Sequence, residues 1–181
     1  MSRLSALSEL VLGGSEYVVQ DILEKLSWPD IQRALRADTS LVAVLNASFL
    51  LRPYLDGRRL AHNQAVVLAW MRSHGEEYES VEDVVYLNLW GDRRVTYIPA
   101  EIYTLVNLKE LVLTETGITS VPRELGNLAA LEELDLSDTR ITNVPREFGQ
   151  LTTLVRLDLY GTRVSSIPDE VRAIPGLRIL Q

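Results

Sequence analysis

Apolar and polar positions recur with a period of 23 residues through the second half of this chain. Four prolines stand 23 residues apart: Pro99, Pro122, Pro145 and Pro168. Leucines keep the same step at Leu111, Leu134, Leu157 and Leu180. Leu87 precedes Leu111 by 24 residues, because the first unit carries one extra residue within 91–94. A fixed period of this length predicts an array of stacked structural repeats.

The third unit, residues 134–156, shows what one repeat is expected to form. Its Leu-x-Leu start predicts a short strand in which Leu134 and Leu136 point inward and Asp135 points outward. Pro145 then opens a helical or 3-10 segment, where its missing N–H costs least. Phe148 starts the apolar face that leads back toward the next strand. One unit cannot bury this face alone, so the pattern predicts stacked units that share one core and a parallel sheet.

These units resemble the leucine-rich repeat family, in its 23-residue class LxxLxLxxNxIxxLPxxxxxLxx, over residues 84–181. The resemblance implies an α/β fold: a short solenoid with a concave parallel sheet and a convex side of 3-10 or helical segments. We expect four repeats and a partial fifth strand that begins at Ile179. One departure is systematic, because Thr116, Thr139 and Thr162 replace the family's Asn. A Thr hydroxyl both donates and accepts, so we expect the family's ladder between turns to persist through Thr, with Asp92 near that place in the first unit.

Residues 1–83 lack the repeat and show helical spacing instead. Residues 84–181 would then form a second domain, the solenoid. We expect four helical segments in the first half: Val18–Leu26, Ile31–Ala37 after a Pro-containing turn, a stretch from Thr39 or Ser40 to Leu51 that Pro53 ends, and Arg58–Ser73, which ends at His74-Gly75. The last segment offers five apolar side chains for burial: Leu60, Ala61, Val67, Leu68 and Met71.

The all-helical N-terminal domain has two interpretations. Terminal repeats of a solenoid expose apolar side chains and a strand edge, so the helices are expected to serve as an N-terminal cap. The stretch Ile22–Ile31 is also similar to the core of an F-box, which implies an adaptor whose helical half recruits a second protein. A third alternative is a structural module with no dedicated ligand site.

Composition narrows the chemistry. The chain has 181 residues, a hydrophobic fraction of 46%, a net charge of −7 and no Cys. The absence of Cys excludes disulfides, thiol nucleophiles and Cys-based metal sites. The acidic balance argues against nucleic acid as the partner. No apolar run approaches the length of a membrane helix, and the first ten residues lack a secretory signal, so we expect a cytoplasmic location and no membrane partner.

No constellation of catalytic residues is evident. His62 has no Cys, His or carboxylate at metal-ligand spacing, and His74 suits a helix end. Motifs for phosphate loops, dinucleotides, zinc proteases and serine hydrolases are all missing from the sequence. We therefore predict no enzyme activity, no cofactor and no metal.

Function is expected at the outward strand positions, because the family usually binds ligands on the concave face. The predicted partner-binding residues, for another protein of unknown identity, are Tyr86, Asn88, Trp90, Glu110, Val112, Glu133, Asp135, Arg156, Asp158 and Tyr160. One column of these positions turns acidic toward the C-terminus, and another places Trp90 and Tyr160 at its two ends. Aromatic residues beside polar ones are typical anchors of a protein interface. The alternative is that these are ordinary solvated positions, with Trp90 packed on the helical cap.

Two further patterns lie near the strands. Arg140 aligns with Arg163, and Glu115 aligns with Asp138, so opposite charges on neighbouring units are expected to stabilise the stack. A fifth strand at residues 179–181 without a polar cap would leave a free edge. We expect either self-association through this strand or a very short capping strand.

Overall fold

The computed structural model describes residues 24–37 and 51–181 of the chain. Contacts divide the chain into two compact units, Met1–His62 and Asn63–Gln181, and the division falls inside a helix. The sequence predicted a domain boundary between residues 83 and 84. That boundary states which part of the chain folds independently, which contacts alone do not test, so it stays a prediction. The first and third predicted helices fall largely outside the described residues, whereas the F-box-like stretch is described from residue 24 to residue 31.

The first unit contains helix α3, Trp28–Ala37, which begins three residues before the predicted start at Ile31. Ser27 precedes the helix, and its hydroxyl donates to the Asp30 carboxylate at 2.6 Å. The Ser27 carbonyl accepts from the amide of Ile31 at 3.1 Å. The amide of Asp30, one of the groups that a helix start leaves free, also bonds to the Ser27 carbonyl at 3.1 Å, and Pro29 in the first turn has no N–H to satisfy.

Helix α5, Leu51–Ser73, is longer than the sequence predicted. Pro53 was expected to end the preceding segment, and that prediction is wrong: Pro53 lies in the first turn of α5, where no intrahelical bond requires its N–H. The predicted end is confirmed, since the amide of His74 bonds to the Met71 carbonyl and Gly75 adopts a φ of 90°. None of the described helices combines the length and apolarity needed to cross a membrane.

The C-terminal part of α5 shares a hydrophobic cluster with the repeats. Val67, Trp70 and Met71 are buried in this cluster, and Leu68 packs against it. Burial was predicted correctly for Val67 and Met71, whereas Trp70 was not predicted. Leu60 and Ala61 are exposed, so their predicted burial is wrong.

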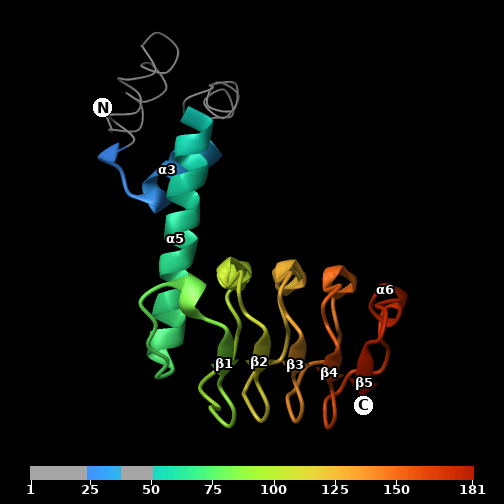
Figure 1. Cartoon of the computed structure of the whole chain (residues 1–181). Coiled ribbons are helices and arrows are strands. Elements are labelled where there is room, and N and C mark those ends of the chain that lie inside the picture. Colours follow the sequence, from blue (N-terminus) through green and yellow to red (C-terminus); the bar gives the residue numbers. More distant parts are fainter. Residues whose placement is uncertain (1–23, 38–50) are drawn as a thin grey trace. The chain divides into compact units, whose positions relative to one another are not determined.

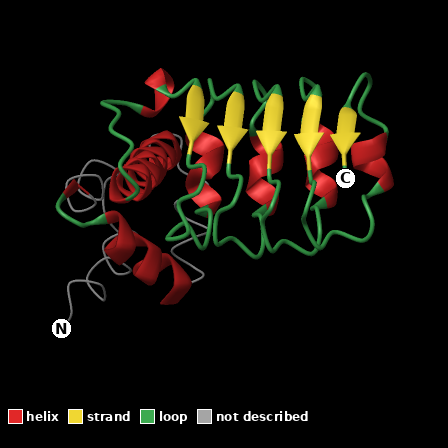
Figure 2. Cartoon of the chain, turned by 90° about the horizontal axis from the view of Figure 1, so that it is seen from below, coloured by secondary structure: helices red, strands yellow, loops and turns green. Residues whose placement is uncertain are grey.

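The repeats form a five-stranded parallel sheet in the order β1-β2-β3-β4-β5. Its strands are β1 Tyr86–Asn88, β2 Glu110–Val112, β3 Glu133–Asp135, β4 Arg156–Asp158 and β5 Arg178–Leu180. All five point the same way in one row, with short helical segments on the face behind them (Figure 1, Figure 2). The inward leucines of neighbouring strands pair directly and are buried, which confirms the solenoid that the repeat predicted.

Short helical segments cover the other face of the sheet. After η1 Val81–Asp83 they are η2 Ala100–Thr104, η3 Arg123–Asn127, η4 Arg146–Gln150 and α6 Asp169–Arg172. Each of the last four begins directly after one of the four periodic prolines, whose extended backbone forms the N-cap. The predicted role of these prolines is therefore confirmed.

The register of β5 differs from the prediction. The 23-residue step placed Leu180 inward in line with Leu157, but Leu157 pairs with Ile179 and Leu180 pairs with Asp158. The last unit is thus one residue shorter than the others. A shift of one residue moves a side chain to the opposite face of a sheet, and Leu180 is accordingly 45% exposed.

The repeated Thr residues do not form the expected ladder between units. The hydroxyls of Thr116, Thr139 and Thr162 each donate at 2.7 Å to the carbonyl three residues earlier in their own unit. Neighbouring units are joined there by backbone bonds, such as the amide of Glu115 to the Ser137 carbonyl at 3.1 Å. The shorter reach of a Thr hydroxyl, compared with an Asn side chain, accounts for this difference.

Candidate protein-binding face

The solvent side of the sheet, called the concave face below, carries all ten predicted partner-binding residues. Parallel pairing aligns them in rows across the strands. The first row contains Tyr86, Glu110, Glu133 and Arg156, and the second contains Asn88, Val112, Asp135 and Asp158. A third row, two residues beyond the strand ends, contains Trp90, Thr114, Ser137 and Tyr160.

These residues differ widely in exposure. Trp90 and Tyr160 are the most open of them, at 63% and 65%. Tyr86, Asn88 and Arg156 are also exposed, and the strand positions on β2 and β3 are half-buried. Asp158 is only 8% exposed, which leaves little of its surface for a partner.

The side chains of the second row bond to the backbone at the strand ends. Asn88 Oδ1 accepts from the amide of Trp90 at 2.9 Å. Asp135 Oδ1 accepts from the amide and the hydroxyl of Ser137, at 2.9 and 2.6 Å. Asp158 Oδ1 accepts from the amide of Tyr160 at 3.1 Å. This bond to the backbone two residues on is characteristic of Asn and Asp, and it fixes the backbone from which the third row projects.

Arg156 is the cation of β4 on this face. It donates to Asp158 Oδ2 at 3.0 Å and lies 3.7 Å from Glu133 Oε2. The hydrogen bond to Asp158, with the neighbouring carboxylates, raises the pKa of Arg156 further above its ordinary value. Its charge is therefore committed mainly to Asp158 and only weakly to Glu133.

The sequence prediction missed two concave-face residues, Arg178 and Leu180 on β5. Arg178 continues the first row beside Arg156, and Leu180 continues the second row beside Asp158. The sequence contained a signal for them in the alternation of Arg178, Ile179 and Leu180. The 23-residue period masked this signal, because it predicted that Leu180 lies in the core.

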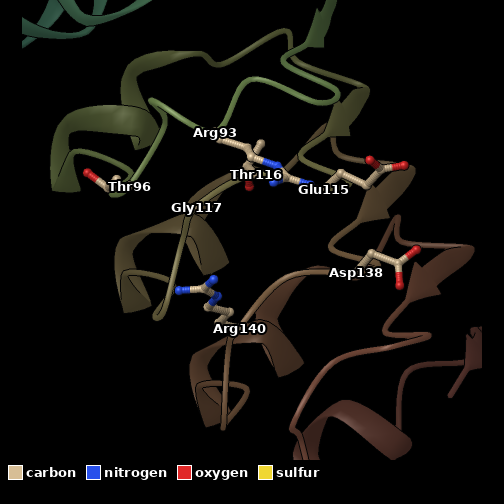
Figure 3. Close-up of a pocket in the computed structure, with 7 residues that line it drawn as sticks. All are labelled: Arg93, Thr96, Glu115, Thr116, Gly117, Asp138 and Arg140. Atoms are coloured by element: carbon tan, nitrogen blue, oxygen red, sulfur yellow. The ribbon is translucent and has the colours of Figure 1, made fainter.

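A hollow of about 390 Å³ lies among the loops beyond β1 to β3 (Figure 3). Its lining contains two Arg and two acidic residues, together with Thr96, Thr116 and Gly117. The four charged residues are Arg93, Glu115, Asp138 and Arg140. These four form no ion pair within 4.0 Å in the described structure. Arg140 therefore does not form the expected ion pair with Glu115 or Asp138. Its two Arg and two carboxylates give the hollow a formal charge of zero.

The histidines show structural contacts. His74 Nδ1 lies 2.8 Å from the Trp70 carbonyl and 3.1 Å from the Ser73 hydroxyl, at the end of α5. Within residues 24–37 and 51–181, no group of three or more His, Asp or Glu side chains is arranged to hold a metal ion.

Comparison with known proteins places the repeats in a family. A family model described as a leucine-rich repeat region matches residues 85–181, over half of the chain. Such regions generally mediate protein–protein interaction and are typically non-catalytic. Among curated proteins, no match was found.

Two solved structures are similar to parts of the chain. A leucine-rich repeat protein of Leptospira interrogans (LIC12759) is 35% identical over 46% of this chain and 22% of its own, with a TM-score of 0.41. An internalin (inlF) of Listeria monocytogenes is 24% identical over 55% of this chain and 35% of its own, with a TM-score of 0.44. The chain thus spans about a third or less of the length of these proteins. On the family match and its own repeats, the chain belongs to the leucine-rich repeat family.

Proposed function

We propose that this chain is a non-catalytic recognition module that binds a partner protein on its concave face. One observation carries the proposal: Trp90 and Tyr160, the two most exposed large hydrophobic residues in the described part of the chain, lie in one row of this face. Large exposed apolar side chains are costly in water and mark interaction sites when they gather on one surface. Trp and Tyr are also enriched among the residues that dominate binding energy.

The backbone beneath these aromatics is held in place. Their amides are bonded by Asn88 and Asp158, whose bonds restrict the strand ends from which the two rings project. A rigid aromatic anchor loses little conformational entropy on binding, which favours affinity. Both the exposure and the support of these residues thus fit a docking surface.

Partner capture from the cell's own lysate tests this function. The double substitution Trp90→Ala/Tyr160→Ala in the full chain is expected to abolish specific capture. Tyr97→Ala is a matched control, because Tyr97 is 59% exposed and lies outside the sheet. Unchanged capture by the double variant, or equal loss in the Tyr97 variant, would contradict a concave binding face.

Two other roles stay predictions. In the adaptor role, deletion of residues 1–62 removes recruitment of a second protein. Residues 63–181, which keep the part of α5 that joins the repeat core, still bind their own partner. If the chain self-associates through β5, light scattering at high protein concentration should detect dimers. A strictly monomeric species would contradict the latter.

A further inference from the structure

Exposed large apolar side chains are unevenly distributed over the part of the chain that the structure describes. Nine such residues are found there, and four of them lie on the concave face. The four are Tyr86, Trp90, Tyr160 and Leu180. They divide into a first apolar group at β1, containing Tyr86 and Trp90, and a second apolar group at β4 and β5, containing Tyr160 and Leu180.

Between the two groups the concave face carries charge. On β2 and β3 its outward residues are Glu110, Val112, Glu133 and Asp135, with no cation among them. Lys109, directly before β2, is already paired with Glu132 at 2.8 Å. The middle of the face is therefore acidic. A small hollow there is lined by both Glu residues and Asp135, and Arg156 of β4 also lines it.

The two Glu residues are poorly compensated within the fold. Glu110 and Glu133 are directly paired neighbours in the sheet, an arrangement of like charges that destabilises it. Glu110 has no ion pair within 4.0 Å in the described structure, and the only cation near Glu133, that of Arg156, is 3.7 Å away and bonded to Asp158. A cation from another molecule would relieve this repulsion.

The spacing of the apolar groups limits what can bridge them. Three strand spacings separate β1 from β4, which amounts to about 14 Å. An extended peptide advances about 3.3 Å per residue, so residues four positions apart span nearly the same distance. A residue midway between them would lie above β2 and β3, opposite Glu110 and Glu133.

We propose that the concave face binds an extended partner segment with apolar residues at both ends of a five-residue stretch and Arg or Lys at its centre. The inference rests on the proposed function and specifies its partner. The first and second apolar groups receive the two apolar residues, and the central cation bonds to Glu110 and Glu133. Trp90 and Tyr86 add cation–π attraction for a further basic residue beside the first anchor.

Selection from a phage-displayed library of random 12-residue peptides on the immobilised full chain tests the proposal. We expect enrichment of sequences with Arg or Lys flanked two residues away on each side by apolar residues. A synthetic peptide of the most enriched sequence should bind more weakly as NaCl is raised, because salt screens the charge contacts. Enrichment of acidic or uncharged sequences, of a basic–apolar pattern with helical spacing, or of no sequence at all would overturn the inference.

Variants of the chain then test the basic partner segment separately from the concave binding face. Glu110→Lys/Glu133→Lys is expected to weaken the selected peptide roughly tenfold or more, through like-charge repulsion. Glu124→Lys is the matched control, since Glu124 lies on η3 outside the sheet, and it should leave affinity unchanged. A peptide with Glu at its centre should regain affinity for the double Lys variant.

The outcomes distinguish this inference from the proposed function. If Trp90→Ala/Tyr160→Ala abolishes peptide binding but Glu110→Lys/Glu133→Lys does not, the concave binding face is supported and the inference of a basic partner segment is wrong. Peptides insensitive to both double variants would overturn the concave face itself. Circular dichroism of each variant confirms that a loss of binding is not a loss of fold.

Discussion

Single side chains at the strand ends both stabilise the backbone and form part of the concave face. Asp135 was predicted to bind a partner, yet its carboxylate also accepts two hydrogen bonds from Ser137. Truncating Asp135 to Ala would therefore disturb the strand end and the surface together. Glu110 is the cleaner probe, because the described structure records no ion pair for it.

Glu110→Gln is expected to stabilise the fold and to weaken partner binding. The substitution removes like-charge repulsion with Glu133 while keeping the side chain's size. A gain of about 0.2–1 kcal/mol in the free energy of unfolding follows from typical cross-strand charge effects. Urea unfolding followed by circular dichroism measures it. A loss of stability would show that Glu110 has a structural role that its contacts do not reveal.

Asp92 gives a pH-dependent prediction. Its carboxylate accepts three hydrogen bonds from Arg94, at 2.9 to 3.0 Å, and the bond to that guanidinium is the main cause that lowers the pKa of Asp92 below its ordinary value. A lowered pKa in the folded state contributes stability above the ordinary value of 3.8, and this contribution disappears as pH falls through the folded-state pKa.

Asp92→Asn should consequently lower the free energy of unfolding at neutral pH by up to about 1 kcal/mol, since the pair is largely at the surface. The difference between the two proteins should shrink below pH 4. Urea midpoints measured from pH 3 to pH 7 provide the test. A difference that stays constant over this range would contradict the assigned role of the Asp92 carboxylate.

At the scale of elements, the sequence predicted periodic features well and departures from the period poorly. The prolines predicted the starts of η2, η3, η4 and α6, because each proline is the N-cap residue of the helical segment in its unit. The fifth strand was expected at the right place but in the wrong register, because the final unit is one residue shorter. The early start of α5 was missed since a proline in a first turn looks, in sequence, like one that ends a helix.

The contact between the segments η3 and η4 depends on a glycine that the sequence analysis did not single out. A Cβ placed on Gly126 would lie 2.7 Å from the carbonyl carbon of Glu147, closer than real contacts allow. Gly126→Ala must therefore move the backbone of one segment, at a cost of about 1–3 kcal/mol. Urea unfolding of the full chain measures this loss.

Gly57→Ala is the control for this substitution. Gly57 lies within α5, and a Cβ there would meet no atom within 4 Å. Since Ala favours a helix over Gly by about 1 kcal/mol, this variant should be as stable as the original or more so. Equal destabilisation by both variants would show that glycine flexibility, rather than close packing at η4, explains the effect.

At the scale of the whole molecule, the repeats share one continuous core that begins before the first repeat. The cluster extends from Val67 on α5 to Ile174 after α6. The sequence predicted the repeat core because every unit repeats the same apolar positions. It could not predict that Trp70 joins this core, since a helix shows which residues share a face but not which element that face meets.

This core bears on the predicted boundary between residues 83 and 84. A fragment of residues 84–181 lacks Val67, Trp70 and Met71, which are 0%, 5% and 0% exposed. Full burial of one large apolar side chain contributes about 1.5–3 kcal/mol, so three of them approach the total stability of many domains. We expect the fragment 63–181 to unfold cooperatively in urea and the fragment 84–181 to be markedly less stable or unfolded. Equal midpoints for the two fragments would instead support an independent solenoid that starts at residue 84 and would leave the helix without a capping role.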